Sequence, residues 1–551
     1  MRERFGELFL SYGVNYYTAD KPLAEMLRQR EFHGDDDLET LGRLVSTEMV
    51  EAVDIIDHRA PPFLQTWGLL GNRIDYVRIS PEHRRILSRL IDLGVTRKSV
   101  AGTFPWLYHF VSGYLISDTG LFCTLTLTAQ TGYALQKYGD PSLKERYLHH
   151  FLPPAGEWLG ATFYSEIQGG SDLGANRTLA EPRGGSWVLN GEDKYFASNA
   201  GLADAALVTA KRAPPREGVR GLSFFFVPTA SEPSGDSTFE IRRLKDKLGT
   251  VAVPTGEVVL KDTPAFLLGS ADQGVYYALE VLNISRLDNA FASVGIARKS
   301  LWEAYRYALH RKTFGKTLIE HPLLARDLLE MEADVEGGLA LALESALAFQ
   351  RTVDTVPPYD DIYHYARLLA HVAKYSTAIM SREVTSYAME VLGGIGFFEE
   401  FPLAKLHRDA LVTPIWEGTS NIQALDALEV IMKKQAHELL LRDLTARIEA
   451  VSTEVDMKHD LGHMLGRLRT QIDDIVSSGE KAVFYAKDLI GDLGELATAT
   501  YLLSFADRLR KEKGEGWAMA LAQVYFHRHI ARESTPAALL AEIPGALGWM
   551  G

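Results

Sequence analysis

The chain has a single cysteine, Cys123, and this scarcity excludes several kinds of chemistry. One thiol cannot form an intrachain disulfide, a CxxC redox pair or a cysteine-ligated cluster. Cys123 lies in an apolar run, which favours a small buried hydrophobe over a nucleophile. The sixteen histidines show no HExxH or comparable ligand spacing, so we expect no metal site.

Long apolar runs are also missing. Polar side chains interrupt the apolar stretch at residues 121–135, and no segment reaches the roughly 18 unbroken apolar residues of a typical membrane span. The first residues lead into aromatic and polar positions without a small-residue cleavage site, which argues against a secretory signal. We therefore expect a soluble, cytoplasmic protein with no membrane span.

Positive charge is in the minority, because 58 Lys and Arg residues face 72 Asp and Glu residues and the formal net charge is −14. Broad affinity for nucleic acids needs clustered Lys and Arg that displace counterions from phosphates. Residues 438–551 carry 13 Lys and Arg against 17 Asp and Glu, a net charge of −4. Their basic cluster at residues 508–513 is interleaved with carboxylates, which is typical of a solvated helix face. DNA is therefore not an expected partner.

The pattern of apolar and polar residues changes twice along the chain, from helical to strand-like and back to helical. Helical periodicity dominates from about residue 22 to 147, and the sequence Pro153-Pro154-Ala155-Gly156 breaks it. Short strand-like runs follow from about residue 158 to 268. Residues 222–227 read as a buried strand, and Asn190-Gly191 is a strong hairpin-turn signal.

Helical periodicity returns near Val275 and continues to the end of the chain. One helical segment, from about residue 363 to 392, is longer than an average globular helix, which indicates a helical bundle. A chain of 551 residues also exceeds a single hydrophobic core, so we predict an α+β multidomain protein. Its predicted parts are an N-terminal extension and helical domain (1–155), a middle β-barrel or sandwich domain (156–272), a helical bundle (273–436) and a C-terminal helical extension (437–551).

The most informative segment for chemistry is residues 415–423, Ile-Trp-Glu-Gly-Thr-Ser-Asn-Ile-Gln. Glu417 stands among apolar neighbours that can exclude water, and desolvation raises a carboxyl pKa toward the range that a base needs near neutral pH. Gly418 lets the backbone approach a ligand closely, and residues 419–421 can cap a helix that starts near Ile422. A capped helix start with a solvated Glu417 remains an open alternative.

Four other segments carry weaker signals, and each has a purely structural alternative. Residues 162–172 hold a glycine pair beside hydroxyl groups, which can bind phosphate or ring carbonyl oxygens or form an ordinary turn. Residues 194–199 place an aromatic and hydroxyl pair on a predicted strand, where simple packing is the alternative. Residues 311–316 fit a phosphate clamp or a helix C-terminus followed by a turn. Residues 390–396 fit a ligand-binding loop or the glycine end of a long helix.

Four of these segments, at residues 162–172, 311–316, 390–396 and 415–423, resemble the signature segments of the acyl-CoA dehydrogenases in their order along the chain, and the resemblance covers about residues 60–435. The resemblance implies the helical, β-barrel and helical-bundle plan of that family. It also implies FAD-dependent α,β-dehydrogenation of an acyl-CoA thioester to a trans-2-enoyl-CoA. More narrowly, residues 168–172, 243–249 and 389–396 and the helical extension resemble the AidB-like, alkylation-response branch.

The resemblance assigns roles to individual residues. Glu417 is implied as the base that takes the α-proton, because Ser285 occupies the position where some members keep their catalytic glutamate. Arg286 matches a family arginine near the bound acyl-CoA. The FAD contacts implied for one subunit are Thr162, Ser165, Ser171, Phe196, Ala197, Ser198, Thr419 and Asn421. A neighbouring subunit is expected to contact the same FAD through Arg311, Phe314, Glu390, Gly393 and Gly394, which implies a homo-oligomer, usually a tetramer.

The chain also departs from the family pattern. Ile167-Gln168 replaces the usual Pro-Gly after Glu166, a carboxylate that we expect to be structural. Pro322 stands where many members carry a glutamine, and Glu390 brings a negative charge near the expected pyrophosphate. Two alternatives stay open: a DNA-binding flavoprotein of the alkylation response, and an acyl-CoA oxidase, in which a helical extension also occurs. The sequence does not identify the acyl chain or the electron acceptor, for which an electron-transfer flavoprotein is one candidate.

Overall fold

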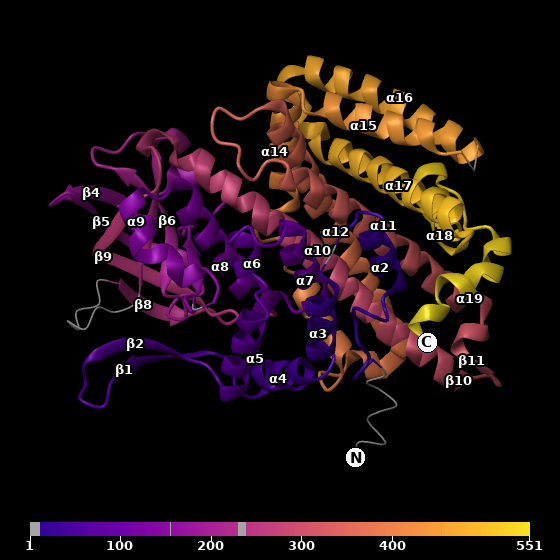
Figure 1. The fold of residues 1–551 in the computed structure, drawn as a ribbon, viewed down its shortest axis with the longest axis horizontal. Helices are drawn as coiled ribbons and strands as arrows, with labels where there is room; N and C mark the ends of the chain where they lie inside the picture. The colour runs from indigo at the N-terminus through magenta and orange to yellow at the C-terminus, as the bar shows by residue number, and fades with distance from the viewer. Residues whose placement is uncertain (1–10, 33, 155, 230–238, 453–454) are drawn as a thin grey trace. The chain divides into compact units, whose positions relative to one another are not determined.

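The computed structural model describes residues 11–32, 34–154, 156–229, 239–452 and 455–551. The chain divides into two compact units, and its path is coloured from indigo to yellow in Figure 1. The helical unit comprises Met1–Thr47, Phe110–Ser117 and Asn289–Gly551, and the barrel unit comprises Glu48–His109 and Asp118–Asp288. Two helices, α7 (Trp106–Ile116) and α10 (Gly274–His310), contain residues of both units.

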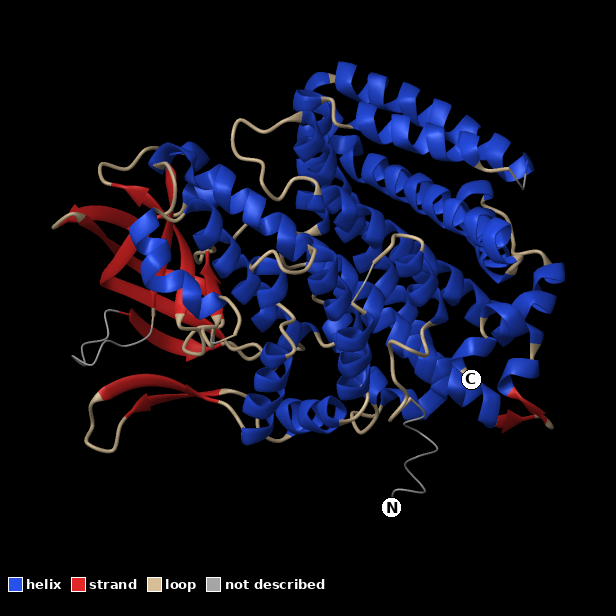
Figure 2. Cartoon of the chain, viewed as in Figure 1, coloured by secondary structure: helices blue, strands red, loops and turns tan. Residues whose placement is uncertain are grey.

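The barrel unit is built on a seven-stranded sheet in the order β3-β5-β4-β6-β7-β9-β8, drawn in red in Figure 2. Additional pairings of β3 with β6 and of β5 with β9 fold the sheet back on itself. Alternate apolar side chains such as Phe163, Val208 and Phe225 are buried and form its core. The predicted middle β-barrel domain is therefore confirmed. The strands are β3 (Gly160–Phe163), β4 (Leu179–Arg183), β5 (Ser186–Ser198), β6 (Ala205–Arg212), β7 (Leu222–Pro228), β8 (Phe239–Leu244) and β9 (Thr255–Leu267).

The hairpin turn predicted at Asn190-Gly191 is wrong, because β5 runs straight through it. The turn lies earlier, at Gly184-Gly185, where both φ angles are positive and β4 pairs back onto β5. Gly191 instead sits at an irregularity of the β5–β9 register. A Cβ there would lie 2.5 Å from Thr178 Oγ1, so the glycine serves close packing inside a strand.

A second hairpin interrupts the helical run predicted for residues 22–147, which is wrong at this point. Strand β1 (Phe63–Trp67) pairs antiparallel with β2 (Arg73–Arg78). The buried Asp75 carboxylate accepts a hydrogen bond from the Ile241 N–H of β8 at 2.9 Å. The hairpin is therefore fixed by a strand far away in the sequence, which local helical periodicity could not reveal.

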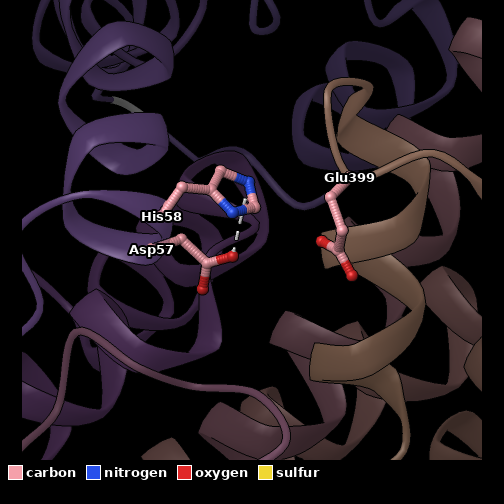
Figure 3. A group of neighbouring side chains, drawn as sticks. All are labelled: Asp57, His58 and Glu399. Carbon is pink, nitrogen blue, oxygen red and sulfur yellow. Dashed lines mark ion pairs between the residues drawn. The ribbon is translucent and has the colours of Figure 1, made fainter.

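The other N-terminal elements of the barrel unit are helical, as predicted. Helix α8 is buried along nearly its whole length, and the Asp118 carboxylate caps it by accepting from the Leu121 N–H at 2.8 Å. At the end of α4, the His58 imidazole lies 3.7 Å from the Asp57 carboxylate, and Figure 3 marks this ion pair with a dashed line. Glu399, also drawn there, belongs to the helical unit, where it pairs with Arg408 at 2.8 Å. The helices are α4 (Glu48–His58), α5 (Pro81–Asp92), α6 (Arg97–Val100), α8 (Thr119–Tyr138) and α9 (Pro141–Tyr147).

The helical unit confirms the predicted bundle and its helical extension. The predicted long segment is α12, which packs against α11 and α14. Helices α15, α16 and α17 run side by side, and α17 also packs on α11, α12 and α14 (Figure 1). Among the described residues, no helix combines the length and the apolar character needed to cross a bilayer. The helices are α2 (Lys21–Arg28), α3 (Asp35–Val45), α11 (Pro322–Gln350), α12 (Asp361–Leu392), α13 (Pro402–Ala410), α14 (Ser420–Lys434), α15 (His437–Ala450), α16 (Val455–Ser477), α17 (Ala486–Lys513), α18 (Trp517–Tyr525) and α19 (Ile543–Ala546).

A buried charge cluster lies inside the helical unit. The Arg298 guanidinium of α10 donates hydrogen bonds to the carboxylates of Glu332 and Glu336 of α11. Its Nε lies 3.7 Å from the Asp20 carboxylate, which also accepts a hydrogen bond from the Tyr114 hydroxyl at 2.5 Å. All five side chains are buried. One guanidinium thus faces three carboxyl groups away from water, which favours retention of a proton by the carboxyl groups.

Candidate active site

Glu417 lies on a turn before α14 that has an unusual backbone conformation. The φ angles of Glu417 and Gly418 are +56° and +95°. Left-handed φ values are uncommon for residues with a Cβ and persist where the surrounding structure imposes them, which is often at functional sites. The Glu417 side chain is half-buried. The structure therefore presents this carboxylate from a strained turn rather than from an ordinary solvated loop.

The end of the turn is a helix cap, as predicted. Thr419 is the N-cap of α14, and its hydroxyl oxygen accepts from the Ile422 N–H at 3.4 Å. On the other side of Glu417, the Trp416 indole N–H donates to the Asn289 side-chain oxygen. A capped helix start and a side-chain hydrogen bond from the residue before Glu417 therefore occur together at this turn.

Buried polar side chains fix the two carbonyl groups that follow Glu417. The Gln423 amide N–H₂ donates to the Glu417 carbonyl at 2.9 Å and to the Gly418 carbonyl at 3.0 Å. The Lys374 ammonium of α12 donates to the same Gly418 carbonyl at 2.7 Å, and His371 Nδ1 donates to Gln423 Oε1 at 2.8 Å. All three side chains are fully buried. Sequence reasoning missed Lys374 and His371, although a Lys inside an apolar helical run is itself a signal, because Lys is rarely buried without a partner.

Glu166 has a structural environment, in line with the expectation from sequence. Its carboxylate pairs with Lys194 at 3.1 Å and accepts from the Thr178 hydroxyl at 2.6 Å, and both charged side chains are fully buried. Burial alone would raise the pKa of Glu166, but Lys194, Thr178 and two backbone N–H groups lower that pKa on balance. Burial lowers the pKa of Lys194, against the effect of Glu166. The pair braces the segment that carries Ser165 and Ser171.

Four residues expected at the flavin lie on two adjacent strands of the barrel unit. Thr162 of β3 pairs in register with Ser198 of β5. Phe196 is half exposed, whereas Ala197 is fully buried in the barrel core, so alternation along β5 puts Phe196 and Ser198 on the opposite face. The Ser165 carbonyl accepts from the Tyr195 N–H at 3.1 Å, which joins the glycine loop to β5.

The glycine loop, residues 167–172, is mostly exposed. Gly169 has a φ of +110°, and a Cβ on Gly170 would lie 2.2 Å from Ser165 Oγ. Ser171 is exposed and Ser165 is half-buried. A larger residue at Gly170 would therefore displace Ser165, one of the expected flavin contacts.

Arg286 is buried in the part of α10 that belongs to the barrel unit. Its guanidinium donates to the Asn283 side chain at 2.9 Å. The Ser285 hydroxyl donates to the Leu282 carbonyl of its own helix at 3.1 Å. The Ser285 side chain is thus engaged with the backbone of its own helix.

The residues expected to face a neighbouring subunit lie on exposed parts of the helical unit. Arg311 precedes a two-stranded hairpin, β10 (Lys312–Thr313) and β11 (Lys316–Thr317), whose tip is Phe314-Gly315. Phe314 is 98% exposed at a φ of +49°. Glu390 is exposed near the end of α12, and a Cβ on Gly394 would meet nothing within 4 Å.

Each of these two sets of residues, taken by itself, suits one part of a flavin nucleotide. The barrel unit offers an exposed aromatic ring beside hydroxyl groups and a glycine loop, which suit a planar ring system and its carbonyl oxygens. The helical unit offers Arg311 and glycines without side-chain cover, which suit a pyrophosphate. Thr419, the N-cap of α14, and Asn421, on the first turn of that helix, are both exposed and follow Glu417 closely in the chain. Glu390 is the residue that fits least, because its charge would repel phosphate.

The basic cluster of the C-terminal extension is occupied by carboxylates of the chain itself. Arg508 pairs with Glu512 at 2.7 Å, Lys511 pairs with Asp507 at 2.5 Å, and Lys513 pairs with Glu25. Arg28 of α2 also reaches Glu512, at 2.7 Å. These ion pairs join α2 to α17 and offset the positive charge that a DNA-binding face would need.

Comparisons with known proteins agree with these features. Models of the AidB N-terminal domain and of the middle and C-terminal domains of acyl-CoA dehydrogenases match residues 11–154, 161–263 and 272–432. AidB of Escherichia coli (strain K12) is 32% identical over 438 residues, which are 76% of this chain and 78% of that protein.

Two solved structures show the same fold. ACDH-11 of Caenorhabditis elegans in complex with C11-CoA has a TM-score of 0.80 at 24% identity, over 96% of this chain and 91% of that one. An acyl-CoA dehydrogenase of Bacillus anthracis complexed with FAD has a TM-score of 0.71 at 19% identity, over 84% and 82% of the chains. The chain thus belongs to the acyl-CoA dehydrogenase family of FAD-dependent oxidoreductases, in its AidB-like branch.

Proposed function

We propose that the protein is an acyl-CoA dehydrogenase that converts an acyl-CoA thioester to a trans-2-enoyl-CoA, with Glu417 as the base. The observation that carries the proposal is the strained turn at Glu417, held by buried Gln423 and Lys374. A residue that served only as a helix-start charge would not need such support. Relatives that act on acyl-CoA or are named with it, such as ACDH-11 with C11-CoA, support the substrate class.

The reaction requires a base and a group that polarises the thioester carbonyl. An α C–H beside a thioester is a weak acid, so the carbonyl oxygen must be polarised while a base takes the proton. We assign proton removal to the Glu417 carboxylate and polarisation of the thioester oxygen to the Glu417 backbone N–H. FAD, when bound, supplies the acceptor for the β-hydride. Arg286 is proposed to help bind the acyl-CoA.

We further propose that Thr162, Ser165, Ser171, Phe196, Ala197 and Ser198 bind FAD in one subunit, with Thr419 and Asn421. Because the Ala197 side chain is buried, its contribution would come from the backbone. Arg311, Phe314, Glu390, Gly393 and Gly394 would approach the FAD of a neighbouring subunit in a homotetramer. The exposure of Phe314 (98%) and Phe397 (79%) in the single chain supports such an interface.

The test is an anaerobic stopped-flow experiment on protein reconstituted with excess FAD. The purified protein should be yellow and release FAD on heating in near-stoichiometric amount. A panel of acyl-CoA substrates that differ in chain length and branching is then mixed with it, and flavin bleaching is followed. At least one acyl-CoA should reduce the flavin. Protein that binds FAD but is reduced by no member of the panel would contradict the proposed reaction.

A further inference from the structure

The Glu417 turn needs an explanation for how its conformation is maintained. A left-handed φ is sterically unfavourable for a residue with a Cβ, and the neighbouring Gly418 adds conformational freedom in the unfolded chain. The Thr419 cap fixes only the start of α14. The peptide groups on the C-terminal side of Glu417 must therefore be held by contacts from elsewhere.

Lys374 and Gln423 supply those contacts. A peptide group is planar, so a hydrogen bond to its carbonyl oxygen also sets the direction of its N–H. Gln423 fixes the plane between Glu417 and Gly418, and Lys374 and Gln423 together fix the next plane. The first plane determines ψ of Glu417 and, with it, how the side chain leaves the backbone.

Of the two side chains, that of Lys374 costs more free energy to bury. Its side chain is fully buried on α12, and burying an ammonium group is costly unless hydrogen bonds satisfy it. A hydrogen bond from a charged donor is roughly twice as strong as a neutral one, and it is directed here at 2.7 Å onto the Gly418 carbonyl. The placement of a costly charge behind the strained turn indicates that the turn requires it.

We propose that Lys374 is a positioning residue for the Glu417 carboxylate, acting through the Gly418 carbonyl. This inference rests on the proposed function of Glu417 as the base. In this role Lys374 does not touch the substrate. Its loss shifts the carboxylate away from the α-carbon and slows proton removal while acyl-CoA binding is kept. A displacement of about 1 Å at a reacting group can cost on the order of 100-fold in rate.

The experiment compares Lys374→Met, which removes the charge and the donor, with Lys374→Gln, which keeps an amide donor. Both holoenzymes are assayed for the limiting rate of flavin reduction and for the Kd of the acyl-CoA. We expect the limiting rate to fall by at least about 10-fold for Lys374→Met and by less for Lys374→Gln, with Kd changed less than about threefold. The matched control is Lys405→Met, which removes a largely buried lysine paired with Asp409 on α13. It should lower thermal stability and leave the reduction rate unchanged.

Crystal structures of the FAD-bound wild type and Lys374 variants give a readout that needs no substrate. The Glu417-Gly418 turn should change its backbone conformation while α12 and α14 stay in place. An unchanged turn, or a reduction rate equal to that of wild type, overturns the proposal for Lys374. Failure of the wild type to react with any acyl-CoA would instead count against the proposed function, and the turn conformation would still decide the structural part.

Discussion

Replacement of Glu336 by Gln should make the stability of the protein less sensitive to alkaline pH. Burial raises the pKa of Glu336 well above its usual value, and nearby Glu332 and Asp20 raise it further, against Arg298. The hydroxyl groups of Tyr114 and Tyr305 are further titratable groups that interact with this cluster. Because the folded pKa is raised, the folded state holds a proton that the unfolded chain has already lost at neutral pH.

The sign and size of the effect follow from that proton. When the native state binds more protons than the unfolded state, the free energy of unfolding falls as pH rises, by up to about 1.4 kcal/mol per pH unit for one proton. The contribution of Glu336 is therefore full below the pKa of the unfolded chain and is lost as pH rises through its folded pKa. Gln cannot ionise, so the variant should lack this slope at pH values above the pKa of the unfolded carboxyl group.

The assay is thermal unfolding of wild type and variant over that pH range, by calorimetry at constant ionic strength. Glu344→Gln on the same helix is the matched control, because burial of Glu344 is outweighed by Arg30 and Arg447 and its pKa is lowered. That variant should be less stable at every pH above neutral without a change in slope. Parallel pH profiles for wild type and Glu336→Gln would refute the protonated cluster.

Three further predictions concern the cofactor, the assembly and DNA. Glu390→Gln should tighten FAD binding by roughly fivefold, because removal of one negative charge near a phosphate is worth about 1 kcal/mol at the surface. A titration of FAD fluorescence measures the Kd, and weaker binding by the variant would contradict the placement of Glu390 near the pyrophosphate. Phe314→Asn, which suits the positive φ, should weaken the homo-oligomer in light-scattering measurements, and an unchanged mass would remove Phe314 from the interface. Duplex DNA should bind weakly and without specificity at about 150 mM salt, and sub-micromolar binding lost on neutralising the cluster at 508–513 would favour the alkylation-response alternative.

Much of the fold could be predicted from the sequence wherever the same spacing of apolar residues continues over a long segment. The segment expected at 363–392 is α12, Asp361–Leu392, because a long helix repeats its apolar pattern many times. The β1–β2 hairpin and the passage of β5 through Asn190-Gly191 depend instead on partners far along the chain. The residue types at a turn do not identify such distant partners. The division into four domains, with boundaries near residues 155, 272 and 436, stays a proposal.

The sequence predicts which segments form the candidate site, but it does not predict which residues elsewhere in the chain hold those segments in place. Glu417 was identified by its aromatic and glycine neighbours, which are local. Lys374 and His371 act on it from α12, more than forty residues earlier, so no local pattern links them to the turn. Glu166 is a poor control for a base variant, because removing its charge would leave buried Lys194 unpaired, at a cost of roughly 3–5 kcal/mol.

The role of Glu417 is tested most directly by the rate of anaerobic flavin reduction in Glu417→Gln. The amide keeps the shape of the side chain and the backbone N–H but cannot accept the α-proton. With an acyl-CoA that reduces the wild type, the rate should fall by about 10²–10⁴-fold or more, while FAD and acyl-CoA binding stay nearly intact. The control Glu429→Gln changes an outer carboxylate of α14 that pairs with Arg367, and it should reduce at the wild-type rate. A Glu417→Gln protein whose flavin is reduced at near wild-type rate would show that the base lies elsewhere.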